Sequence, residues 1–113
     1  MIKKHYTDVQ EEKVTMANSV KATIRWLITK DDGAKRYTTR RFEIQAGGKI
    51  GIHEHPEEHH IYILQGTGVI IDGQGNELEG KTGDVLYVPS NEPHGYRNDG
   101  NEIFAFLCVI PYL

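Results

Sequence analysis

The segment that decides the fold runs from residue 53 to residue 63 and reads HEHPEEHHIYI. It begins with His53 and His55, passes through a proline, and places His59 at the start of an alternating apolar run. Alternate side chains of a β-strand share one face, so His53 and His55 point the same way and can hold one ion. Imidazole nitrogens suit divalent first-row metals. We therefore predict a metal site at this segment.

A helical interpretation of the same segment fails. His55 and His59 are four residues apart, as in the zinc-protease motif, but that motif needs a glutamate directly after its first histidine. Here that position is Pro56, and the flanking residues favour a strand. His60 would face the opposite side of the strand, and His5 has no partner in the sequence. Neither of these two histidines is assigned a role.

The rest of the chain also predicts β-strands joined by tight turns. Eleven of the twelve glycines lie at or after Gly47, between short runs rich in Ile, Val, Tyr, Phe and Thr. The predicted strands are 22–29, 38–45, 61–65, 68–72, 85–88, 94–98 and 103–110. Turns are expected at Asp72-Gly73 and over 98–101. Many short strands with few helices are typical of a β-sandwich or barrel.

Length and composition limit the class of protein. A chain of 113 residues allows one domain, which we place over residues 1–113. Thirteen basic and sixteen acidic residues give a net charge of −3 without a basic stripe, so neither nucleic acid nor a membrane is an expected partner. One cysteine, no apolar leader after MIKK and no apolar run of 18 residues predict a cytoplasmic location.

Two stretches of the chain resemble the two motifs of the cupin superfamily. The first motif covers residues 47–66. It offers Gly47, then His53 and His55, then His59 in the position where the family has a glutamate, and Gly66 at the expected distance. The replacement of the glutamate by His59 is a chemically important departure from the pattern.

The second motif covers residues 83–98. It offers Gly83, Pro89, Asn91 in a glycine position, His94 and Asn98. Asparagine tolerates the left-handed conformation of such a turn, so the change at Asn91 is mild. With the flanking strands the resemblance covers nearly the whole chain. It implies an all-β double-stranded β-helix, the cupin jelly-roll barrel.

The resemblance implies a four-histidine metal site, as in a subgroup of small single-domain cupins from bacteria and archaea. Its ligands would be His53, His55, His59 and His94. Four neutral imidazoles leave the full charge of one divalent ion, which favours an anionic ligand in the open positions. We expect manganese or iron, with zinc, nickel and copper as alternatives. Glu57 or Glu58 would supply a carboxylate in the alternative ligand set.

The resemblance implies that three residues on the core side of the predicted barrel lie around the substrate. The resemblance places Phe106 and Cys108, on one face of the last strand, beside the metal, and Ile50 on another wall. Ordinary core packing is the alternative for each. Both faces of the last strand are apolar, so we expect it to be buried on both sides.

Arg40 is a further candidate substrate residue. It shares a strand face with Phe42 and Ile44, which predicts that it points to the core side. A guanidinium there is costly unless it is paired. An inward Arg40 would therefore need a carboxylate partner or an anionic substrate, unless it lies at the barrel mouth and pairs with a surface acid.

These features predict a metal-binding protein that takes a small-molecule ligand or substrate. As an enzyme it would be a metal-dependent dioxygenase or another oxidoreductase, with an apolar wall that excludes water. The thiol of Cys108 is oxidisable and weighs against strong oxygen chemistry. The alternatives are a metal-dependent isomerase, with Tyr96 as the nearby candidate base, and a non-catalytic module that binds a small ligand or a metal.

A homodimer is also expected. The segment before Val20 has too few apolar side chains for a core of its own, yet Ile2, Tyr6 and Val9 need cover. Strand addition across a two-fold axis would provide it.

Overall fold

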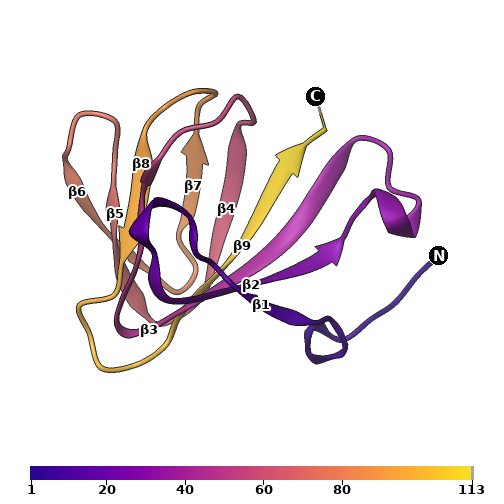
Figure 1. The fold of residues 1–113 in the computed structure, drawn as a ribbon, viewed down its shortest axis with the longest axis horizontal. Helices are drawn as coiled ribbons and strands as arrows, with labels where there is room; N and C mark the ends of the chain where they lie inside the picture. Colours follow the sequence, from indigo (N-terminus) through magenta and orange to yellow (C-terminus); the bar gives the residue numbers. More distant parts are fainter. Residues whose placement is uncertain (113) are drawn as a thin grey trace.

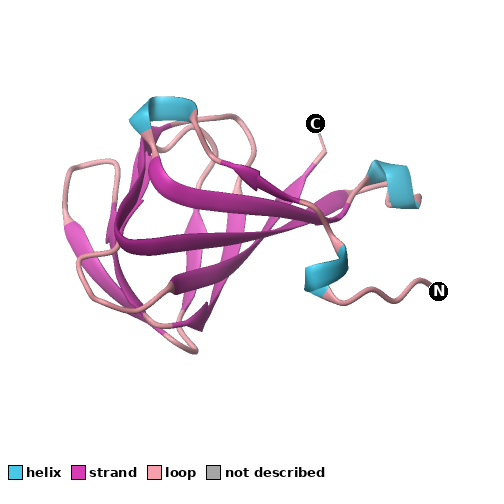
Figure 2. Ribbon diagram, turned by 60° about the horizontal axis from the view of Figure 1, so that its bottom comes forward, coloured by secondary structure: helices cyan, strands magenta, loops and turns pink. Residues whose placement is uncertain are grey.

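The computed structural model describes residues 1–112, which form β-strands joined by loops and three short 3-10 turns (Figure 2). The strands are β1 (Glu11–Lys13), β2 (Val20–Ile28), β3 (Tyr37–His53), β4 (His59–Gln65), β5 (Thr67–Ile71), β6 (Glu77–Lys81), β7 (Val85–Val88), β8 (His94–Arg97) and β9 (Phe104–Pro111). The 3-10 turns are η1 (Tyr6–Asp8), η2 (Met16–Asn18) and η3 (Lys30–Asp32). No helix within residues 1–112 is long and apolar enough to cross a membrane.

The strands of the described residues make one antiparallel nine-stranded sheet. Its order is β6-β5-β8-β3-β9-β4-β7; beside this path, β2 pairs with β3 and β1 pairs with β2. The sheet curls, so that β5, β6 and β8 stand at one side and β1 and β2 lie at the other (Figure 1). A Cβ atom added at Gly80 in β6 would lie 2.6 Å from Cδ1 of Ile63 in β4, although β6 and β4 are not paired. The curled sheet confirms the expected all-β jelly-roll fold.

Strand β3 is longer than the predicted 38–45 and links the two sides of the barrel. Its first part, Tyr37 to Ile44, pairs with β9, and its last part, Lys49 to His53, pairs with β8. Between them the chain bends at Gly47, whose φ of +79° suits glycine. The buried amide of Asn98 holds this bend by donating to the carbonyl of Ile44 at 2.8 Å. The bend brings the end of β3 beside the start of β8.

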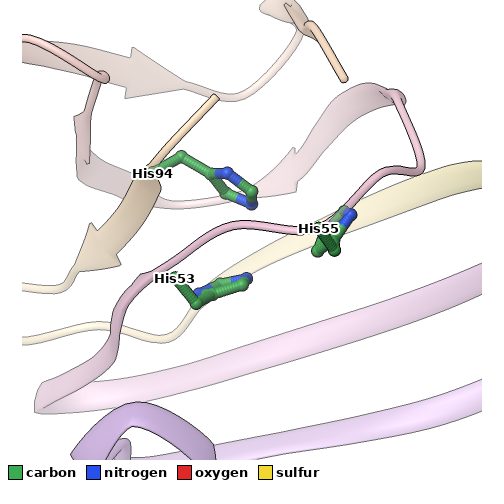
Figure 3. A group of neighbouring side chains, drawn as sticks. All are labelled: His53, His55 and His94. Atoms are coloured by element: carbon green, nitrogen blue, oxygen red, sulfur yellow. The ribbon is translucent and has the colours of Figure 1, made fainter. Parts of the chain in front are cut away.

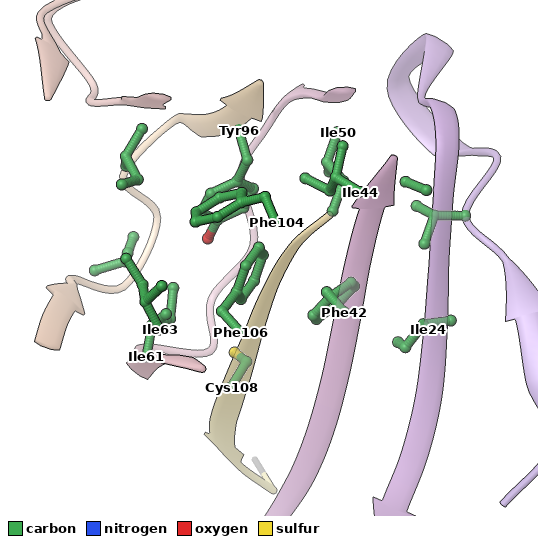
Figure 4. Packing of buried hydrophobic residues seen from close by; sticks show 14 residues of the cluster. Ile24, Phe42, Ile44, Ile50, Ile61, Ile63, Tyr96, Phe104, Phe106 and Cys108 are labelled. Atoms are coloured by element: carbon green, nitrogen blue, oxygen red, sulfur yellow. The ribbon is translucent and has the colours of Figure 1, made fainter. Parts of the chain in front are cut away.

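The core lies inside the curl of the sheet (Figure 4). Phe104, Phe106 and Cys108 of β9 are at most 1% exposed, whereas Leu107 on the opposite face is only partly buried. The expected burial of the last strand on both sides is therefore only partly correct, because on the outer face Ala105 is buried but Leu107 and Val109 are partly exposed. Ile50 of β3 belongs to the same core.

Two strands were not predicted from the sequence, because few of their residues are apolar. Strand β1 has the sequence EEK and is fully exposed, and β6 has the sequence ELEGK with only its glycine buried. Both are strands because they pair with a neighbour along the sheet, β1 with β2 and β6 with β5. Such polar segments become strands because they pair with a neighbouring strand, so their local composition does not predict them.

Candidate metal centre

Four histidines from three strands and one loop meet at one end of the barrel. His53 ends β3, His55 lies in the following loop, His59 begins β4 and His94 begins β8. His53 and His94 are directly opposite each other in the β3–β8 pair. One ring nitrogen each from His53, His55 and His94 lies within 4.8 Å of the others, and their rings face a common space (Figure 3).

The fourth predicted ligand lies against this group. The Nε2 atoms of His59 and His55 are 2.5 Å apart, and the ring centres of His59 and His94 are 4.8 Å apart. His59 and His94 are 3% and 2% exposed, whereas His53 and His55 are half-buried at the rim. The structure therefore places His59 against His55 and His94, although it lies outside the group of three whose nitrogens are all within 4.8 Å of one another. The half-buried rings of His53 and His55 leave one side of the cluster accessible.

Two of the rings are oriented by backbone carbonyl groups. Nδ1 of His53 lies 2.7 Å from the carbonyl oxygen of Gly51, and Nδ1 of His94 lies 2.7 Å from that of Glu92. A carbonyl oxygen only accepts, so each Nδ1 carries the proton and each Nε2 presents a lone pair. This is the arrangement usual for metal-bound histidines. These contacts could not be predicted from the residue types, because every residue has a carbonyl group.

The environment of the rings fits a divalent cation. Nε2 of His94 is buried and has no hydrogen-bond partner within residues 1–112. Burial lowers the pKa of His94 to about 4 and the pKa of His59 to about 2. Both rings are therefore neutral at pH 7, and a neutral imidazole is the form that binds a metal.

The two glutamates considered as alternative ligands lie elsewhere. Oε2 of Glu57 is 3.1 Å from Nδ1 of His55, on the other side of that ring from the Nε2 that contacts His59. Glu58 accepts a hydrogen bond from the hydroxyl of Tyr87, at 2.9 Å. His60 is exposed, and its ring lies 5.8 Å from that of Tyr87. The expected outward direction of His60 agrees with its exposure.

Arg40 points inward, and its partner is a sulfur atom. Nη2 of Arg40 lies 3.0 Å from Sγ of Cys108, and the guanidinium lies 5.6 Å from the ring centre of Trp26 and 5.0 Å from that of Phe42. No carboxylate within residues 1–112 forms an ion pair with Arg40, whereas the neighbouring Arg41 pairs with Glu43. The sequence could not foresee the sulfur contact, because it depends on the pairing of Arg40 with Cys108 between β3 and β9.

The other predicted substrate residues lie in the core. Ile50 and Phe106 are 2% and 1% exposed, and both lie against Tyr96, Ile50 as its pairing partner and Phe106 with a ring-centre distance of 4.7 Å. Cys108 lies closest to the metal centre, since its Sγ is 3.0 Å from Nδ1 of His59. Burial raises the pKa of the Cys108 thiol, while the charge of Arg40 lowers it.

Tyr96 is poorly suited to act as a base. Its hydroxyl is buried and has no hydrogen-bond partner within residues 1–112. Burial raises the pKa of Tyr96 well above its ordinary value. The phenol therefore keeps its proton, which disfavours the isomerase mechanism considered from the sequence.

Comparison with known proteins gives consistent results. The family model described as "Cupin domain" matches residues 40–110. The polyketide cyclase of Streptomyces resistomycificus superposes with a TM-score of 0.92 at 35% identity, covering 98% of this chain and 79% of that one. A structure described as a predicted oxalate decarboxylase from Thermotoga maritima has a TM-score of 0.85 at 30% identity, covering 96% and 97% of the two chains.

A curated relative matches over a shorter part. The oxalate-binding protein of Thermotoga maritima is 41% identical over 71 residues, which is 62% of this chain and 58% of that protein. The chain thus spans little more than half the length of this relative. The matched segment of the family model, 40–110, contains all four histidines of the candidate metal centre.

Proposed function

Since this chain belongs to the cupin family, we propose that it is a metal-dependent cupin that acts on a small, oxygen-rich organic molecule. The proposed ligands of its single divalent ion are His53, His55, His59 and His94. The observation that supports the proposal most is the buried Nε2 of His94, which faces three other imidazoles and has no hydrogen-bond partner within residues 1–112.

The substrate class follows from the donor set and from the relatives. One relative is a polyketide cyclase and another an oxalate-binding protein, and polyketides and oxalate both present carbonyl or carboxylate oxygens. A divalent ion held by four neutral imidazoles keeps its full charge and would polarise such an oxygen as a Lewis acid. His53 and His55, half-buried at the rim, leave access from outside, and the core beneath excludes water.

We place this Lewis-acid role ahead of oxygen activation. Sγ of Cys108 lies 3.0 Å from a proposed ligand, His59, and a thiol there would be oxidised by a reactive oxygen species. Manganese or iron is the ion we propose first, with zinc, nickel and copper as the other metals that imidazole binds.

A non-catalytic binding module is the second candidate. It is favoured by the oxalate-binding relative and by Tyr96, the nearby candidate base, which keeps its proton. In this role the ion would hold an anionic ligand without converting it. The same four histidines would serve both functions.

The test begins with protein purified without an affinity tag. Metal analysis should give about one first-row ion per chain. The protein loaded with manganese, iron or zinc is then offered oxalate and a linear compound with several 1,3-related carbonyl groups. Conversion of either compound supports the enzyme, and tight binding of oxalate without conversion supports the binding module. A protein that neither retains a first-row metal nor takes one up would contradict both.

We also propose a homodimer formed through the outer face of β4, β7 and β9. A groove of about 480 Å³ runs over this face, lined by partly buried Leu107 and Val109 and by exposed Tyr62, Val85 and Tyr87. Such an exposed apolar patch is typical of an interface. Light scattering should report a dimer that Tyr87→Glu weakens. A monomer at micromolar concentration would contradict this proposal.

A further inference from the structure

We propose that Cys108 is a positioning residue for His59, whose sulfur fixes the ring form in which Nε2 of His59 faces the metal centre. The inference rests on the proposed function, because it takes His59 to be a metal ligand. It also gives Cys108 and Arg40 a role different from the substrate contact expected from the sequence.

The candidate ligands differ in what their Nδ1 atoms contact. His53 and His94 each contact the backbone carbonyl two residues before them, at 2.7 Å. Nδ1 of His59 contacts instead the side chain of Cys108, at 3.0 Å, across the β4–β9 pair. Both residues are at most 3% exposed, so solvent water does not replace this contact. The orientation of His59 therefore depends on a side chain, and a substitution can remove it.

The contact decides which nitrogen of His59 can bind a metal. A neutral imidazole has one protonated nitrogen and one with a free lone pair. Nε2 of His59 is the atom that faces His55, 2.5 Å away, so it is the atom available to a shared ion. Its lone pair is free only when the proton is on Nδ1, and that proton then needs an acceptor. Sγ of Cys108 is the acceptor that the structure provides.

Arg40 holds the sulfur in this position. Its Nη2 lies 3.0 Å from Sγ, and a guanidinium can only donate. The sulfur therefore accepts from Arg40 and, in the metal-binding form, also from His59. The rings of Trp26 and Phe42 lie close to the guanidinium and restrict its movement. The side chains of Arg40, Cys108 and His59 thus form a series of contacts from the inner face of β3 to the candidate metal centre.

The test uses the zinc-loaded protein with ¹⁵N-labelled histidine. Two quantities are measured: the dissociation constant of zinc, by competition with a chelator, and the position and solvent exchange of the ring proton of His59, by NMR. The variants are Cys108→Ala, which removes the acceptor, Cys108→Ser, which keeps one, and Arg40→Met. The matched control is Ile61→Val, because Ile61 is the pairing partner of Cys108 and loses a similar volume of core.

We expect Cys108→Ala to weaken zinc binding roughly 10- to 100-fold, the range usual for loss of a hydrogen-bond partner of a metal-bound histidine. Cys108→Ser should recover most of this loss, Arg40→Met should show a smaller loss, and Ile61→Val should leave the dissociation constant unchanged. In the unaltered protein the proton of His59 should be on Nδ1 and exchange slowly. A merely structural role of the thiol would lower stability alike in Cys108→Ala and Ile61→Val without changing zinc binding.

Two results would overturn the inference. One is unchanged zinc affinity in Cys108→Ala, or in Arg40→Met if the alanine variant does not fold. The other is a His59 proton found on Nε2, with the thiol donating to Nδ1. The variant His59→Ala separates this inference from the proposed function: if it binds zinc as tightly as the unaltered protein, the four-histidine centre itself is wrong. If it loses zinc while Cys108→Ala does not, only the role of Cys108 is wrong.

Discussion

The inner and outer faces of β4 differ in every property that matters for the proposed function. His59, Ile61 and Ile63 point inward and are at most 3% exposed, whereas Tyr62 and Leu64 point outward and are 47% and 37% exposed. His59 and His60 are neighbours in sequence, yet one faces the metal centre and the other faces Tyr87 on the outside. The comparison shows that position on the strand, more than residue type, decides which side of the sheet a histidine faces.

The largest difference between the two faces should be in stability. Ile63→Ala leaves a cavity in the core and should lower the free energy of unfolding by about 2–5 kcal/mol. Leu64→Ala, one residue further on the outer face, should lower it by less, closer to the roughly 0.5 kcal/mol usual at the surface. Urea denaturation of the metal-free protein measures both. Equal losses would show that the inner and outer faces are wrongly assigned.

The next difference should be in stabilisation by metal. An ion at 100 times its dissociation constant adds about 2.7 kcal/mol to the free energy of unfolding, because it binds the folded state. His59→Ala should lose most of this gain, and His60→Ala should keep it. Thermal unfolding with and without manganese or zinc gives the comparison. A loss of the gain in both variants, or in neither, would contradict the assignment of His59 as the ligand.

The smallest effect should be a pH dependence of the metal-free protein. Burial lowers the pKa of His94 to about 4, whereas in the unfolded chain the pKa is about 6.5. Between these values the unfolded state binds more protons, so stability is complete above pH 6.5 and falls as the pH is lowered toward 4. The slope for one such histidine is at most about 1.4 kcal/mol per pH unit. Between pH 7 and pH 5.5, urea denaturation should show a smaller loss of the free energy of unfolding in His94→Gln than in the unaltered protein. An equal loss in both proteins would contradict His94 as the origin of the pH dependence.

The sequence predicted the parts of the molecule that local alternation determines. Alternation placed His59 inward and His60 outward, and the two motifs brought in His94 from a distant strand. Alternation did not predict the length of β3, because its second half is a strand only through pairing with β8 across the bend held by Asn98. The contacts at the Nδ1 atoms were also beyond the sequence, since two of them involve backbone carbonyls.

Arg40 illustrates the same limit. The sequence indicated that an inward guanidinium would need a carboxylate partner or an anionic substrate, unless it lay at the barrel mouth. The structure provides the sulfur of Cys108 and two aromatic rings instead. Only the register between β3 and β9, which pairs Arg40 with Cys108, brings these groups together.

The central claim is that four histidine nitrogens bind one ion, and X-ray absorption spectroscopy of the metal-loaded protein tests it most directly. The account predicts one first-row ion per chain with four imidazole ligands at roughly 2.0–2.2 Å, reduced to three in His59→Ala and unchanged in His60→Ala. A spectrum with a sulfur or glutamate ligand in place of an imidazole, or with the same ligand count in both variants, would contradict the account.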